Sequence, residues 1–224
     1  MARGRYLGRI ELRKLPAELA KRYLLEWHPR RLALESGSFP PLTSQALFGN
    51  ELPLEVEIGA GTGEFALSLA AADPAANVLA IEISNRSAHW AAWLAAEAGL
   101  PNLKVLRADF KLLGPMLPPG GWRRAYLHFP DPQHKPADAK RIIFNEVFLD
   151  AMARTLEPGG QLSVVSDAPA FFTQMLELAE GDAHFAKAHP ERYLEGFEPR
   201  VKSRFQLIWE RKARTPRQFV LTRL

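Results

Sequence analysis

The stretch EIGAGTGEF at residues 57–65 constrains the fold more than any other, because it joins the apolar run LPLEV to the helical pattern FALSLAAA. A glycine-rich turn between a strand and a helix lets a ligand approach the backbone and points the first helical N–H groups at it. The glycines are Gly59, Gly61 and Gly63. The third glycine of a dinucleotide fingerprint would fall at Glu64, so this spacing differs from that fingerprint. An acidic Glu57 just before the turn would also be unfavourable beside a pyrophosphate.

Strand and helix patterns alternate after this turn. Apolar strand patterns follow at NVLAIEI, LKVLRAD, RRAYLHF and QLSVVSD, and helical patterns such as SNRSAHWAAWLAAEAGL lie between them. This alternation is typical of parallel β–α units. The final stretch SRFQLIWERKARTPRQFVLTRL reads as two strands that could pair as a hairpin. We therefore expect an α/β fold: a doubly wound, mostly parallel sheet of seven strands with an antiparallel C-terminal edge hairpin.

Charge divides the chain into two basic ends and an acidic middle. Residues 1–50 carry nine Lys/Arg and four Asp/Glu, and residues 192–224 carry nine Lys/Arg and three Asp/Glu. Between them, residues 51–191 carry eleven Lys/Arg and eighteen Asp/Glu. Basic ends attract a polyanion, while the acidic groups stay available for a cationic or hydroxyl-bearing ligand. Apolar residues in 1–50 show no regular helical or strand spacing. We expect a basic arm with short helices over 1–50 and one domain over 51–224.

The sequence indicates neither a membrane protein nor a secreted one. No apolar run is long enough to span a bilayer, the N-terminus lacks the apolar core of a secretory signal, and there is no cysteine. The six histidines show no metal-ligand spacing. We expect a cytoplasmic protein that binds no metal and no membrane, as a monomer or a homodimer.

Acidic residues stand at the ends of successive strand patterns. Glu82 ends the second strand, nineteen residues after the last glycine of the turn, where a doubly wound fold places the carboxylate that binds a ribose diol. Asp109 follows the third strand. Asp131 lies in HFPDP between two prolines, which fix φ and push each preceding residue, such as Phe129, into an extended conformation. Ligands bind outside the carboxyl ends of strands, so we expect these acids to share one site.

Residues 54–224 resemble the tRNA (guanine-N7)-methyltransferase family. The resemblance rests on EIGAGTG, Glu82, the RAD of LRADF, the FPDP loop and the SD of VVSD. The resemblance implies a class I methyltransferase fold and methyl transfer from S-adenosylmethionine to guanine N7 in tRNA, at position 46 of the variable loop. By position it implies a catalytic role for Asp131, cofactor binding by Glu57, Gly59, Gly61, Gly63, Glu82, Asp109 and Asp131, and substrate binding by Lys135, Asp167, Ser203, Arg204, Phe205 and Gln206.

The chemistry that this resemblance implies needs little acid–base catalysis. Guanine N7 already has an in-plane lone pair, so catalysis can consist of aligning N7 with the methyl group inside a negative field. A carboxylate pairs with the adjacent N1–H and N2 amine of guanine, so we expect Asp131, Asp167 and the segment 203–206 to hold the base. Lys135 and the basic ends would contact phosphates.

Two positions depart from the family pattern: Gln133 stands where Trp is usual, and Gln206 where Glu is usual. They leave open an S-adenosylmethionine-dependent enzyme that methylates another RNA base or a small-molecule acceptor. A non-enzymatic RNA-binding module is disfavoured, because every cofactor-side acid is present. Trp90 and Trp93, three apart on a helical pattern, indicate core packing rather than a base-stacking platform.

Overall fold

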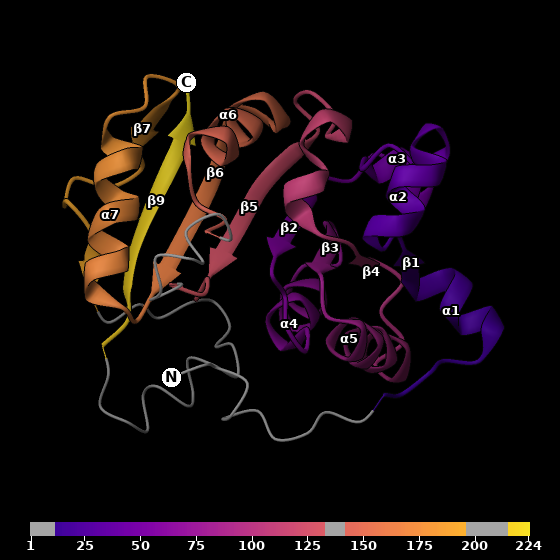
Figure 1. Cartoon of the computed structure of the whole chain (residues 1–224). Helices are drawn as coiled ribbons and strands as arrows, with labels where there is room; N and C mark the ends of the chain where they lie inside the picture. Colours follow the sequence, from indigo (N-terminus) through magenta and orange to yellow (C-terminus); the bar gives the residue numbers. More distant parts are fainter. Residues whose placement is uncertain (1–11, 133–141, 196–214) are drawn as a thin grey trace.

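A computed structural model of the chain describes residues 12–132, 142–195 and 215–224, which form one mixed sheet flanked by helices (Figure 1). The strands are β1 (Leu24–Glu26), β2 (Leu54–Ile58), β3 (Asn77–Glu82), β4 (Leu103–Arg107), β5 (Trp122–His128), β6 (Leu156–Ser166), β7 (Phe185–Lys187), β8 (Leu194–Glu195) and β9 (Arg217–Arg223). The α-helices are α1 (Ala17–Tyr23), α2 (Pro29–Glu35), α3 (Ser44–Phe48), α4 (Glu64–Ala72), α5 (Asn85–Glu97), α6 (Glu146–Thr155) and α7 (Pro169–Glu180). Short 3-10 turns lie at Ser36–Ser38, Phe110–Leu112 and Gly114–Met116. No helix in these ranges is long and apolar enough to cross a bilayer.

The strand order is β1-β4-β3-β2-β5-β6-β9-β7, with β8 beside β9. Strands β1 to β6 pair in parallel, and β9 pairs antiparallel with β6, β7 and β8. The chain leaves β2 toward β3 on one side and returns to β5 on the other. This reversal opens a crevice at the carboxyl ends of β2 and β5, where doubly wound folds bind their ligands.

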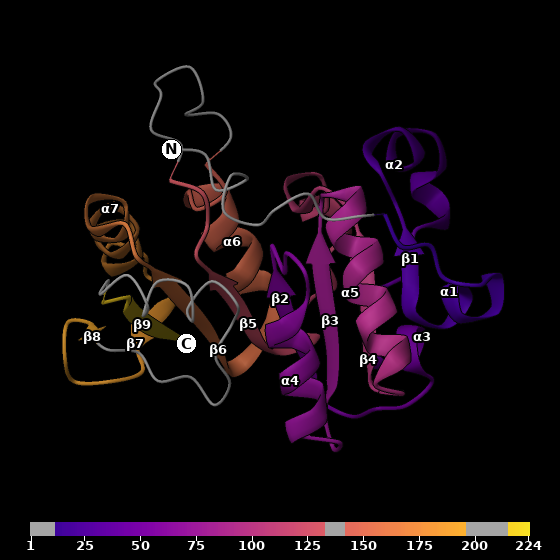
Figure 2. The same ribbon diagram turned by 90° about the horizontal axis from the view of Figure 1, so that it is seen from below.

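Alternating side chains divide each central strand between two cores. In β3, Leu79 and Ile81 belong to the larger core, which also holds residues of α2, α3, α6 and α7, whereas Val78 and Ala80 belong to the smaller core with residues of α4 and α5. Both faces of the strand are buried, which explains its nearly continuous apolar sequence. Figures 1 and 2 show α4 and α5 side by side near the middle of the sheet, with α7 toward one end and α1 to α3 toward the other.

Part of the segment before residue 51 is built into the sheet and its core. β1 pairs with β4, and Trp27, Leu32 and Leu42 are buried in the larger core. The indole Nε1 of Trp122 donates a hydrogen bond to the carbonyl of Leu42 at 2.9 Å. The three short helices α1 to α3 lie in this segment. The division at residue 51 stays a prediction.

The expected fold class is confirmed: the sheet is mostly parallel and doubly wound, with an antiparallel edge near the C-terminus. Three short strands, β1, β7 and β8, were not expected from the sequence. The second strand of the expected hairpin is β9, while its first lies within residues 196–214, outside the described residues. Short strands of two or three residues carry too little pattern to be found in a sequence.

Trp90 and Trp93 lie on the outer face of α5, half-buried, rather than in either core. Their rings are 5.8 Å apart, and the guanidinium of Arg13 sits 4.6 Å and 4.4 Å from the two ring centroids. The expectation of core packing was therefore wrong. The two indoles instead bind the chain just before α1 through cation–π contacts.

Candidate active site

A cavity of about 540 Å³ opens at the carboxyl ends of β2, β3, β4 and β5. Five of the residues expected to hold a cofactor line it: Gly59, Gly61, Glu82, Asp109 and Asp131. The volume is within the range of small-molecule sites. The topology thus brings together residues that are up to 72 positions apart in the sequence, from Gly59 to Asp131.

The glycine turn is held against β3 by its own backbone. The N–H groups of Gly59 and Ala60 both donate to the carbonyl of Ile81, at 2.8 and 3.0 Å. Gly63 has a φ of +82°, and a Cβ atom there would lie 2.5 Å from the Cβ of Ala91 on α5. Only glycine fits at this position, because a side chain would separate α4 from α5.

Gly63→Ala is expected to lower the free energy of unfolding by about 2–5 kcal/mol, from left-handed strain and overpacking together. Gly120→Ala is the matched control, since Gly120 has a φ of +60° but a Cβ atom there would meet no heavy atom within 4 Å beyond its chain neighbours. Gly120→Ala should lower the free energy of unfolding by about 1–2 kcal/mol, from left-handed backbone strain alone. Urea unfolding of both variants measures the difference. Equal losses would show that close packing against Ala91 contributes nothing.

Glu57 does not line the cavity, although it lies directly below the turn in β2. Its side chain is buried, and Oε2 accepts a hydrogen bond from the N–H of Ala66, in the first turn of α4, at 3.1 Å. Gly63, the N-cap residue of α4, has no side chain to supply this bond. Glu57 therefore caps the helix from the neighbouring strand. Its expected contact with a cofactor stays a prediction.

Burial raises the pKa of Glu57 well above 4.5, the hydrogen bond from Ala66 opposes this, and the charges of Glu64 and Glu82 raise the pKa further. The folded protein therefore holds this proton to higher pH than the unfolded chain. We expect stability from this source to be full below pH 4.5 and to be lost as the pH rises through the raised pKa.

Glu57→Gln keeps an acceptor for Ala66 but cannot ionise. The free energy of unfolding of the wild type, relative to this variant, should therefore fall as the pH is raised from 4.5 toward 8. Urea unfolding without ligand at a series of pH values measures the difference. Parallel curves for the two proteins would contradict a raised pKa at Glu57.

Glu82 joins the glycine turn to the start of α5. Its Oε2 accepts from the N–H of Gly61 at 2.8 Å, and its Oε1 accepts from the N–H of Ser84 at 2.7 Å. Burial raises the pKa of Glu82, and these backbone hydrogen bonds partly offset the rise. Each carboxylate oxygen has two lone pairs, so Glu82 can still accept a hydrogen bond from a ligand hydroxyl.

Another wall of the cavity is formed by the residues just after β4. Asp109 lines it and accepts a hydrogen bond from the N–H of Lys111 at 3.1 Å. Apolar side chains flank it: Ile83, which is 58% exposed, and Phe110. A carboxylate beside apolar walls suits a flat heterocycle with an amino group, since the rings stack on the walls and the amine donates to the acid.

The Asp131 loop leaves the end of β5 through a left-handed turn. Among the described residues, Phe129 is the only non-glycine residue with a positive φ, 53°. The prediction that Phe129 would be extended before Pro130 was therefore wrong. Phe129 is buried and donates its N–H to the carbonyl of Val165 at 2.7 Å, so pairing with β6 and burial of the ring override the local preference.

Of the residues expected on the substrate side, the structure places only Asp167. It follows β6, the neighbour of β5, so it lies at the same edge of the sheet as Asp131, although it does not line the cavity. The others, Lys135, Ser203, Arg204, Phe205 and Gln206, lie outside the described residues, as does Gln133.

Sequence reasoning missed several cavity residues: Ile83, Phe110, Lys111 and His128. Ile83 and Phe110 directly follow an acid that was identified, Lys111 lies two positions after Asp109, and His128 ends a strand that was identified. The neighbours of the strand-end acids would have been a sufficient signal for the first three. His128 ends β5 and lines the cavity, although the spacing of the histidines in the sequence gives no sign of a site there.

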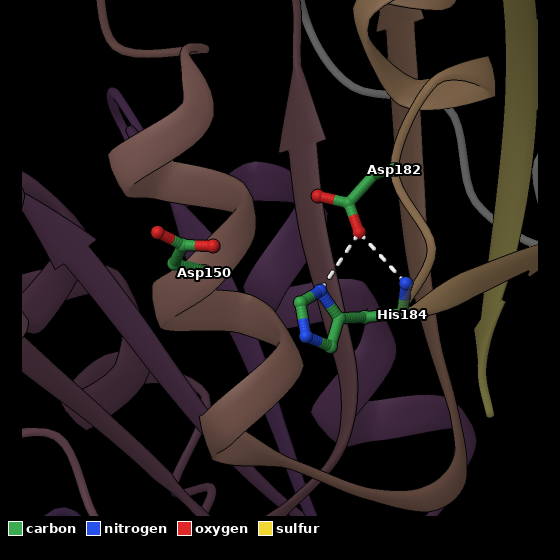
Figure 3. A group of neighbouring side chains, drawn as sticks. All are labelled: Asp150, Asp182 and His184. Carbon is green, nitrogen blue, oxygen red and sulfur yellow. Dashed lines mark hydrogen bonds and ion pairs between the residues drawn. The ribbon is translucent and has the colours of Figure 1, made fainter.

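Within residues 12–132, 142–195 and 215–224, one group of side chains that could ligate a metal lies away from the cavity: Asp150 on α6, with Asp182 and His184 between α7 and β7 (Figure 3). Oδ1 of Asp182 accepts from the N–H of His184 at 2.8 Å and lies 3.0 Å from its Nδ1. This pairing accounts for the arrangement of Asp182 and His184. That the chain binds no metal stays a prediction.

Comparison with known proteins agrees with this geometry. A family model described as "Putative methyltransferase" matches residues 51–217. A tRNA (guanine-N(7)-)-methyltransferase of Rubrobacter xylanophilus is 48% identical over 219 residues, 98% of each chain. A protein of the same name from Chloroherpeton thalassium is 32% identical over 221 residues, 99% of this chain and 98% of the relative.

Solved structures share the fold at lower identity. TrmN from Thermus thermophilus has a TM-score of 0.54 and 23% identity, over 77% of this chain and 44% of that one. The 16S rRNA methyltransferase KamB has a TM-score of 0.56 and 17% identity, over 76% of this chain and 87% of that one. These likenesses show the fold alone.

Proposed function

Since this chain belongs to the tRNA (guanine-N(7)-)-methyltransferase family, we propose that it transfers a methyl group from S-adenosylmethionine to N7 of a guanine in tRNA. The observation that carries this proposal is the near full-length identity to a relative of that name. The cavity supports it, because a glycine turn and three acids from four adjacent strands line one space.

The residues of the cavity fit this cofactor. Glu82 offers carboxylate oxygens for a ribose diol, Asp109 accepts from an adenine amine, and Ile83 is an exposed apolar side chain that a heterocycle would cover. In the turn, a Cβ atom at Gly59 would meet no heavy atom within 4 Å beyond its chain neighbours, which leaves open space there. When bound, S-adenosylmethionine supplies the methyl group from its sulfonium. Glu57 would act on its amino-acid end, directly or through water.

On the substrate side, Asp131 and Asp167 would accept hydrogen bonds from N1–H and the N2 amine of guanine. Both carboxylates lie at one edge of the sheet, after neighbouring strands. Their negative field offsets the positive charge that develops on the purine when N7 is methylated. No group has to remove a proton from N7, so placing the base is the main task of these residues.

We propose guanine 46 of the tRNA variable loop as the target, with Lys135 and residues 203–206 on the substrate side. The basic balance of residues 1–50 and 192–224 supports a polyanionic substrate. Phosphate contacts from these segments would set position and affinity without reading bases. We place the reaction in the cytoplasm, without a metal, and with the protein as a monomer or a homodimer.

The test is methyl transfer from labelled S-adenosylmethionine to unmodified tRNA transcripts in EDTA, with the methylated nucleoside identified after digestion. We expect label in 7-methylguanine, and none in a transcript whose guanine 46 is replaced by 7-deazaguanine. Label at N7 of another guanine would change the proposed target position but keep the proposed reaction. Label in a different base, or in no tRNA while the cofactor still binds, would point to another acceptor and overturn the proposal.

A further inference from the structure

We propose that His128, Ser163 and Gln218 form a positioning group that holds the turn from Phe129 to Asp131 against the sheet. Its consequence for methyl transfer rests on the function proposed above. The three side chains are polar, buried and placed on adjacent strands, and none of them is among the residues expected from the sequence. We call these three residues the strand-end triad.

The strand-end triad is a continuous chain of hydrogen bonds across β5, β6 and β9. Gln218 Nε2 donates to Ser163 Oγ at 3.0 Å, and Ser163 Oγ lies 3.0 Å from His128 Nε2. All three residues are 9% exposed or less. A buried network of this kind fixes the relative placement of its members, since breaking one bond leaves polar atoms without water.

The ring of His128 is also confined by aromatic contacts. Its centroid lies 4.7 Å from that of Phe65 and 5.5 Å from that of Tyr126. Burial lowers the pKa of His128 to about 3, so the imidazole is neutral at physiological pH. A neutral ring suits this position, because His128 lines a cavity proposed to receive a sulfonium, which a protonated imidazole would repel.

The strand-end triad acts at the residue where the Asp131 loop begins. His128 and Gln218 are both in register with Val165, and the carbonyl of Val165 accepts the N–H of Phe129. Phe129 then turns through a positive φ that its neighbours must maintain. Pro130 and Pro132 have no N–H, so the turn itself can form few backbone hydrogen bonds. Anchoring at His128 compensates for this.

A positioning role makes a prediction that a purely structural role does not. Loosening the anchor should move Asp131 and slow methyl transfer, while the cofactor, which the glycine turn and Glu82 hold from the other side, should bind as before. Ser163 is the residue to change, because it joins the other two members and does not itself line the cavity.

The experiment compares Ser163→Ala with the wild type, with Ser163→Thr as the rescue variant that restores a hydroxyl. Ser68→Ala is the matched control, since the Ser68 hydroxyl donates to the carbonyl of Glu64 within α4 and lies outside the cavity lining. Three quantities are measured: hydrogen exchange of the Phe129 and Asp131 amides, the single-turnover rate on tRNA, and the Kd for S-adenosylhomocysteine.

For Ser163→Ala we expect exchange at Phe129 and Asp131 at least tenfold faster, a single-turnover rate at least tenfold lower, and a Kd within twofold of the wild type. Ser163→Thr should recover most of the protection from exchange and most of the rate.

Unchanged hydrogen exchange in Ser163→Ala would overturn the proposal, as would an unchanged single-turnover rate in an active enzyme. A Kd that rises as much as the rate falls would assign the triad to the cofactor instead, and an equal effect of Ser68→Ala would indicate general destabilisation. Exchange needs no methyl acceptor, so it decides the positioning role even if the wild type fails to methylate tRNA.

Discussion

Asp131→Ala is expected to lower kcat for tRNA methylation by about 10²–10³-fold, because it removes the carboxylate that places guanine and offsets its developing positive charge. Asp131 stands on the loop beyond β5, at the edge of the cavity and at the switch point next to β2. Single-turnover rates at saturating tRNA and cofactor measure the effect. Asp131→Asn should still form part of the hydrogen bonding that places guanine but lose the negative charge. Its rate should therefore lie between those of the wild type and Asp131→Ala.

Asp150→Ala is the matched control for this change. Asp150 is an exposed aspartate on α6, outside the cavity lining, so its removal changes the net charge by the same amount. Its rate should stay within twofold of the wild type. A rate for Asp131→Ala within threefold of the control would remove Asp131 from the catalytic machinery and leave Asp167 and the residues outside the described ranges to hold the base.

Glu82→Ala is expected to weaken S-adenosylmethionine binding by about 100-fold, since charge-assisted hydrogen bonds to the two ribose hydroxyls contribute about 1.5–3 kcal/mol each and some are replaced by water. Glu82→Gln should lose about tenfold, because it keeps one acceptor oxygen without the charge. Isothermal titration measures both affinities. The structure also predicts a loss of stability in the alanine variant, as the N–H groups of Gly61 and Ser84 lose their acceptor.

A cofactor analogue separates these two consequences. The 2′,3′-dideoxy analogue of S-adenosylhomocysteine lacks the hydroxyls, so the wild type should bind it much more weakly than the parent compound. Glu82→Ala should bind both compounds with similar affinity. If the variant still prefers the parent by the wild-type factor, Glu82 does not contact the ribose, and its effect on affinity comes from disorder in the glycine turn.

The placement of the acids was predictable because it depends on simple periodicity. Alternation of strands and helices fixes which residues end each parallel strand, and all carboxyl ends of such strands meet at one edge of the sheet. Glu82, Asp109 and Asp131 therefore gather around one cavity, as expected. Glu57 precedes the same turn but caps α4, because a buried helix N-terminus needs an acceptor that Gly63 cannot provide.

Other features depend on contacts between distant parts of the chain and have no local signal. The positive φ of Phe129 follows from its pairing with Val165 on β6, not from its neighbours in sequence. The pairing of His128 with Ser163 depends on the register of β5 against β6. β1 is too short to be recognised, and it forms because β4 offers a free edge. These contacts appear only when the sheet is assembled.

The position of β9 has a consequence for how the protein comes to be folded in the cell. β9 is the last described strand in the sequence, yet it lies between β6 and β7 and pairs with both. During synthesis, the outer edge of β6 stays unpaired until β9, which follows it by about fifty residues, has left the ribosome. An unpaired strand edge recruits other chains, so a slow or stalled translation of the last segment would favour aggregation. The half of the sheet around β2, β3 and β4 carries no such delay, so the two halves should form at different times.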